Sequence, residues 1–181
     1  GNYNVALGLQ SLVTNTTGGN NTGLGYQALN ANTTASNNVA VGYQALDANT
    51  TADNNTAVGT SALTSNTTGT ENVAVGRLAL NANTTASNNI AVGFESLDAN
   101  TTGNENVAVG YSALSTNTVG DRNVALGNNA LTAFAPTGNV DSYNVGVGFN
   151  AGAALTTGIQ NTAIGGLALD AATTADANTA I

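Results

Sequence analysis

Six Asn-Thr-Thr triplets are the residues of this sequence whose type and spacing best suit covalent chemistry. Each is an Asn-x-Thr sequon that can accept an N-linked glycan, and its threonines are candidate acceptors for O-linked sugars. The alternative is that the triplets are turns, because Asn and Thr occur 30 and 28 times and both are common in turns. The candidate glycosylation sites are Asn15, Asn32, Asn49, Asn66, Asn83 and Asn100.

The rest of the inventory excludes most catalytic chemistry. The chain has no His and no Cys, so it lacks an imidazole base, a thiolate, the usual zinc ligands and disulfides. Its carboxylates form no recognisable acid–base pair and no calcium-binding frame, and we interpret them as solvating charge. We therefore expect no enzyme activity, no cofactor and no metal site.

The charge balance excludes two classes of partner. Ten acidic residues against two arginines give a net charge of −8, which disfavours binding to nucleic acid and to anionic membrane surfaces. No apolar run approaches the ~20 residues that span a bilayer, so we expect no membrane insertion by this segment. The start of the chain shows no signal-peptide pattern.

A 17-residue period organises the whole chain. With one glycine of each repeat as position 0, Gly8 is followed by glycines every 17 residues as far as Gly127, then by Gly148 after 21 residues and Gly165 after 17. Position −4 is always Asn, and we expect these side chains to form an amide ladder in a stacked fold. The ladder residues are Asn4, Asn21, Asn38, Asn55, Asn72, Asn89, Asn106, Asn123, Asn144, Asn161 and Asn178.

Each repeat has the pattern of two short strands and two turns. Positions −3, −1 and +4 are apolar and are expected to point into the core, and the glycine at position 0 is expected to bend the chain between the strands. The predicted fold is all-β: a parallel β-solenoid, or β-roll, of about ten 17-residue coils. Residues 1–181 form a single repeat array with a four-residue insertion between Gly127 and Gly148, and without caps it is expected to be a segment or subunit of a longer fibre.

Small residues at two positions indicate association between chains. Position −2 is always Ala or Gly and position +3 is Ala or Ser, although both are expected on the face opposite the core. Small side chains in register favour close approach of another surface, most simply in a closed symmetric oligomer. The alternative is that Ala suits a thin two-layer roll.

Aromatic residues supply the candidate surface contacts. Position +1 carries several of them in an otherwise variable column, and the insertion carries two more beside the only proline, Pro136. Such residues are suited to contacts with sugars or protein partners. The alternatives are packing against a neighbouring chain and a neutral loop. The candidate contact residues are Tyr26, Tyr43, Phe94, Tyr111, Phe134 and Tyr143.

The repeat resembles known fibre proteins. The frame Asn38-Val39-Ala40-Val41-Gly42 is similar to the head repeats of YadA-type trimeric autotransporter adhesins, and Gly25-Tyr26-Gln27-Ala28-Leu29 to repeats of bacterial surface fibres and phage tail fibres. The resemblance implies a left-handed β-roll, a homotrimer and an extracellular role, although adhesin heads have shorter repeats. It covers essentially the whole chain.

These observations predict a structural and adhesive segment of an extracellular fibre, on a cell surface or a virion tail fibre, that gives rigidity, reach and attachment to a glycan or host-surface protein. The alternatives are a monomeric β-roll that binds ice or glycans, and a filament subunit that stacks end to end. Against ice binding, the paired threonines are adjacent and would point to opposite faces of a strand.

Overall fold

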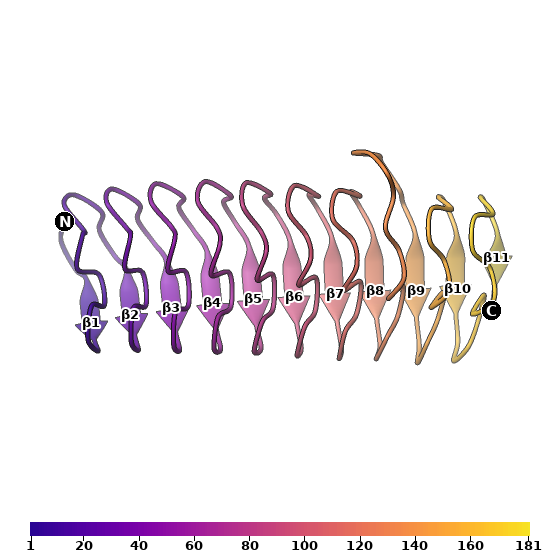
Figure 1. Ribbon diagram of the computed structural model, residues 1–181, viewed down its shortest axis with the longest axis horizontal. Helices are drawn as coiled ribbons and strands as arrows, with labels where there is room; N and C mark the ends of the chain where they lie inside the picture. Colours follow the sequence, from indigo (N-terminus) through magenta and orange to yellow (C-terminus); the bar gives the residue numbers. More distant parts are fainter.

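The computed structural model describes all 181 residues, Gly1–Ile181, as one stack of similar coils (Figure 1). Each coil contributes a single short strand to one face of the stack, and the chain contains no helix. The strands are β1 (Val5–Leu7), β2 (Thr22–Leu24), β3 (Val39–Val41), β4 (Thr56–Val58), β5 (Val73–Val75), β6 (Ile90–Val92), β7 (Val107–Val109), β8 (Val124–Leu126), β9 (Val145–Val147), β10 (Thr162–Ile164) and β11 (Thr179–Ala180). The fold is a parallel β-solenoid, as predicted.

The eleven strands form one parallel sheet in chain order, β1 to β11. Equivalent frame positions pair across every junction, for example Val39 with Thr56 and Val41 with Val58. The four-residue insertion does not shift this register, because Val124 pairs with Val145, which occupies the same frame position. Sequence period and structural period therefore coincide along the whole chain.

Each coil has one strand where the sequence predicted two. The segment after the glycine is a series of turns, and its residues at positions +2 and +4 have left-handed backbones, with φ of 53° at Gln44 and 51° at Leu46. A strand needs negative φ throughout, so the second predicted strand cannot form. The turns nevertheless bond from coil to coil: the Leu46 N–H donates to the carbonyl of Ala62 at 3.1 Å.

The faces of the strand are also reversed from the prediction. The alanine at position −2 points inward and is fully buried, as in Ala40 and Ala74, while positions −3 and −1 lie on the outer face. The inner space admits only a small residue: a Cβ on Gly23 would lie 2.5 Å from the Ser11 Oγ. The small columns at −2 and +3 thus form the core with the leucines at +4, and they are not an interface.

The glycine at position 0 is required by the close stacking of the coils. Gly76 has a φ of 138°, and a Cβ there would lie 2.3 Å from the carbonyl oxygen of Gly93 in the next coil. Both the backbone angle and the contact exclude other residues. This is why the frame holds glycine at every copy.

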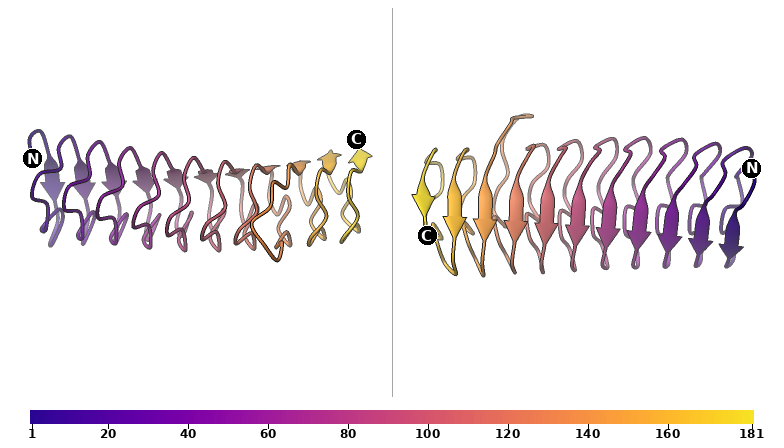
Figure 2. Two further views of the ribbon diagram at one scale, coloured as in Figure 1. Left: turned by 90° about the horizontal axis from the view of Figure 1, so that it is seen from above. Right: turned by 180° about the vertical axis from the view of Figure 1, so that it is seen from behind.

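The coils make a straight, narrow rod, and only the insertion departs from it (Figures 1 and 2). Between β8 and β9 the chain extends past the turns of its neighbours as a protruding loop. No helix of sufficient length and apolarity to cross a membrane is found.

Candidate functional site

The asparagines at position −4 lie inside the coils and connect each coil to the next. The backbone N–H of Asn55 donates to the Asn38 Oδ1 at 2.8 Å, and the N–H of Asn72 donates to the Asn55 Oδ1 at 3.0 Å. The same bond crosses the insertion, from the Asn144 N–H to the Asn123 Oδ1 at 3.2 Å. This ladder of amides runs from Asn4 to Asn178, and its members from Asn21 to Asn161 are buried away from solvent.

A second amide ladder, at position +7, accounts for the asparagines of the Asn-Thr-Thr triplets. The Asn66 Nδ2 donates to the Asn49 Oδ1 at 3.1 Å and to the carbonyl of Gly69 at 2.9 Å. The Asn55 Nδ2, from the first ladder, donates to the same Gly69 carbonyl at 2.9 Å. Each of the seven coils that contain Asn at position +7 therefore holds a backbone carbonyl that accepts one hydrogen bond from each ladder.

Burial contradicts glycosylation at five of the six triplets and fits the alternative that the triplets are turns. Those five asparagines are fully buried, so a glycan on their nitrogens does not fit the folded coil. The Asn15 amide in the first coil is half-buried and donates to the Gly18 carbonyl at 2.9 Å. The sequon pattern concerns three adjacent residues and carries no information on how asparagines 17 residues apart stack, so it does not predict this burial. The buried sites are Asn32, Asn49, Asn66, Asn83 and Asn100.

The two threonines of each triplet have different environments. At position +8 the hydroxyl donates to the next coil, as from the Thr67 Oγ1 to the Thr84 carbonyl at 3.0 Å. At position +9 the side chain is exposed, as in Thr68 and Thr85. The first threonine stabilises the stack and the second faces solvent.

The aromatic residues at position +1 stack on one another along the rod. The Tyr26 and Tyr43 rings are 5.3 Å apart and nearly parallel, and so are Phe94 and Tyr111 at 5.5 Å. The guanidinium of Arg77 covers the other face of Phe94, at 5.2 Å. Because the ring faces are covered by neighbouring rings or by Arg77, the column exposes mainly ring edges to solvent. Ring edges are a poor surface for stacking on a sugar ring.

The insertion separates its two aromatic residues. Phe134 occupies position +7, where the seven preceding coils have Asn, and it is fully buried, so its prediction as a surface contact was wrong. Tyr143 is 48% exposed at the base of the loop. The sequence pattern assigns Phe134 to the loop because the four-residue insertion interrupts the 17-residue period there.

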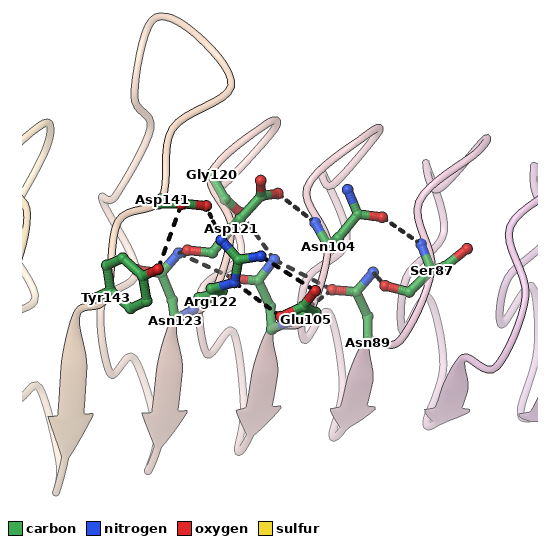
Figure 3. A network of polar contacts seen from close by, with 11 residues as sticks. Ser87, Asn89, Asn104, Glu105, Gly120, Asp121, Arg122, Asn123, Asp141 and Tyr143 are labelled. Atoms are coloured by element: carbon green, nitrogen blue, oxygen red, sulfur yellow. Dashed lines mark hydrogen bonds and ion pairs between the residues drawn. The ribbon is translucent and has the colours of Figure 1, made fainter.

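Arg122 ties the base of this loop to the preceding coils (Figure 3). Its Nε donates to the Glu105 Oε2 at 2.9 Å, its Nη1 pairs with Asp141, and its guanidinium lies 5.8 Å from the ring centre of Tyr143. The hydrogen bond to Glu105, followed by the charge of Asp141, raises the pKa of Arg122. This cluster was not predicted from the sequence, although Glu105 and Arg122 share one frame position 17 residues apart.

The carboxylates do not assemble into a site. No group of three or more acidic, His or Cys side chains is placed to hold a metal ion, and the structure has no pocket. Burial raises the pKa of Asp47, and burial followed by the charge of Glu95 raises that of Asp98. The Asp47 Oδ1 is buried without a hydrogen-bond partner, so this carboxylate is poorly accommodated in its coil.

The outer face of the sheet is formed by residues that the sequence pattern predicted to lie in the core. Two columns, at positions −3 and −1, carry only Val, Leu, Ile and Thr in all eleven strands, and no charged residue. They are half-buried by their neighbours in the column or more exposed, as at Ile90 (41%) and Val109 (37%). The face is therefore uncharged, largely apolar and without a partner within the chain, and it twists gradually along the rod (Figure 2).

Comparisons of this chain with protein-family models, curated proteins and solved structures found no match.

Proposed function

We propose that this chain is a structural and adhesive segment of an extracellular fibre, on a cell surface or a virion tail fibre. The observation that supports it best is the amide ladder that continues through every coil from Asn4 to Asn178. Equivalent bonds at every junction make the array stiff, and about ten coils at ~4.8 Å give a rod of roughly 50 Å. Its work is to provide rigidity and reach, with no catalytic step and no cofactor.

Other parts of the proposal rest on the resemblance to adhesin heads and fibre repeats. They are the left-handed winding, the association of three chains and attachment to a glycan or host-surface protein. Exposed aromatic residues are Tyr43 and Tyr111, whose ring edges in the stacked column suit a protein contact better than a sugar, and Tyr143 beside the loop. The net charge of −8 favours solubility of an exposed fibre.

Two measurements test this proposal. Small-angle X-ray scattering of the purified chain should give the profile of a rod about 50 Å long, and a compact or disordered profile would refute the rod. Immunogold labelling of intact cells and particles from the source, with antibody against the purified chain, should mark their surface. Labelling confined to the cell interior would refute the extracellular role.

Ice binding is a second candidate, and the outer face of the sheet is the observation that favours it. This face presents Thr56 and Val58 on one strand and Val73 and Val75 on the next, in a regular array. Thermal hysteresis of a dilute solution tests the idea. Hysteresis abolished by Val75→Lys would favour ice binding, and a value at the buffer baseline would remove it.

A further inference from the structure

We infer that the outer face of the sheet, positions −3 and −1 of β1 to β11, is the surface on which a second copy of this chain packs. The sequence pattern pointed to the small columns at −2 and +3 as the contact, but these fill the core. The columns left outside are apolar along the full length of the rod. This inference rests on the proposed fibre role, in which chains associate side by side.

The size of this face reaches the lower limit for a specific contact. Eleven strands at ~4.8 Å, each about 10 Å long, give a footprint of roughly 500 Å² for each copy. Two copies would bury about 1,000 Å², the smallest area expected of a specific interface. An apolar patch of this size is also at the upper end of what monomers expose.

The distribution of charge identifies the partner. All twelve charged side chains lie at other positions, chiefly +5, +11 and +12, although the chain carries a net charge of −8. Two copies that meet through positions −3 and −1 bring no like charges into contact, whereas contact through the turns would place acidic residues opposite one another. The shared period of the coils lets every strand of one copy face a strand of the other. A second copy of this chain therefore fits the face better than a charged partner does.

The test uses a matched set of variants in the whole chain. Ile90→Glu places a charge at the centre of the face, Ile90→Thr introduces a residue that this column already contains at Thr22 and Thr56, and Thr85→Glu adds the same charge on an exposed turn. Because Ile90 points away from the core, all three variants should fold. Circular dichroism and thermal unfolding check that they do.

Light scattering over a range of concentrations gives the mass of each variant. The wild type, Ile90→Thr and Thr85→Glu should have a mass of two or three times 17.7 kDa. In Ile90→Glu the dissociation constant should rise by more than about thirtyfold, so that the mass falls to that of one chain.

Two results would overturn the inference: a wild-type chain that stays monomeric at every concentration, and assemblies that Ile90→Glu leaves intact, which would place the contact elsewhere. Rod-shaped scattering from a monomer would contradict this contact while leaving the proposed fibre segment standing. Loss of the rod profile would contradict the fibre segment itself.

Discussion

The regular coils, which hold Asn at position +7, and the C-terminal coils, which hold apolar residues there, fill their interiors differently. From Asn15 to Asn117 the coils contain two amide ladders, whereas in the following coils position +7 holds Phe134, Leu155 and Ala172. The ladder at −4 continues through both regions. Where the second ladder stops, the Asn117 Oδ1 accepts the Gly120 N–H at 3.0 Å, so its last rung is not left unpaired.

This difference shows which polar column the fold requires. The −4 side chain bonds the backbone N–H at the entrance of each strand, a group that an apolar residue would leave unsatisfied. The +7 side chain mainly bonds other +7 side chains and a carbonyl that already has a donor. A whole column at +7 can therefore be replaced by apolar residues, while a single interruption within it is costly.

The largest effect is expected at the glycine of position 0, which both regions contain. Gly76→Ala should lower the free energy of unfolding by about 3 kcal/mol or more, because its Cβ meets the next coil's backbone at an unfavourable φ. Gly165→Ala is the matched control, since nothing lies within 4 Å of its Cβ position and only the backbone strain of its φ of 120°, about 1–3 kcal/mol, remains. Urea unfolding measures both. Equal losses would show that stacking does not select this glycine.

An asparagine introduced at position +7 of the C-terminal coils tests the comparison directly. Leu155→Asn should cost about 2–4 kcal/mol, because it loses apolar burial and leaves a buried oxygen without a partner between Phe134 and Ala172. Adding Ala172→Asn supplies the next rung and should recover about 1 kcal/mol. The measurement is a double-mutant cycle in urea. Strict additivity would mean that rungs at +7 do not stabilise one another.

Interrupting the ladder in the regular region should cost less. Asn66→Ala removes donors and acceptors shared with Asn49, Asn83 and Gly69, for an expected loss of about 2 kcal/mol. Asn15→Ala, at the half-buried first rung, should cost less because water replaces the lost bonds. Hydrogen exchange would locate the opening at the coils around Asn66. Identical losses at the two sites would argue against a ladder whose rungs support each other.

The smallest effect concerns the half-buried carboxylates of the regular coils. Burial raises the folded-state pKa of Asp47, so its ionised form destabilises the coil and the wild type gains stability as the pH falls toward the ordinary aspartate pKa. Asp47→Asn should therefore be slightly more stable than the wild type at about pH 7, with the difference closing at about pH 4. Thermal unfolding at the two pH values measures this.

Asp170→Asn is the control, at the same frame position of the C-terminal region. Asp170 is exposed, so its replacement should leave the stability nearly unchanged at both pH values. If the gain at Asp47 persists undiminished at low pH, its cause is not the buried charge.

The sequence predicted the solenoid because the period of 17 is nearly unbroken, and a fixed frame of apolar and turn residues leaves few other folds. It failed on the direction of the side chains. Alternation told which residues share a face, but not which face is inside, and the choice of Val over Ala for the core was wrong. The leucines at position +4 led to the incorrect prediction of a second strand. Leu46 has a φ of 51°, which is rare for leucine and is not predicted by any local pattern.

The candidate surfaces were predicted less well than the fold. The Asn-Thr-Thr triplets and Phe134 seemed exposed because each was judged from its neighbours in sequence, whereas burial depends on residues 17 positions away. The Arg122 cluster depends on the loop returning beside Asp121, whose N–H donates to the Val140 carbonyl at 2.9 Å. A four-residue insertion carries no signal of where it folds back.

The register across the insertion has a consequence for how such a chain changes over generations. Each strand contacts only the strands before and after it, and Val124 pairs with Val145 as if the extra residues were absent. Recombination between two copies of the repeat therefore adds or removes whole coils without disturbing any other junction. The length of the rod becomes a heritable quantity that varies in steps of one coil, and the turn between β8 and β9 marks a place where extra residues enter without changing the register of the flanking strands.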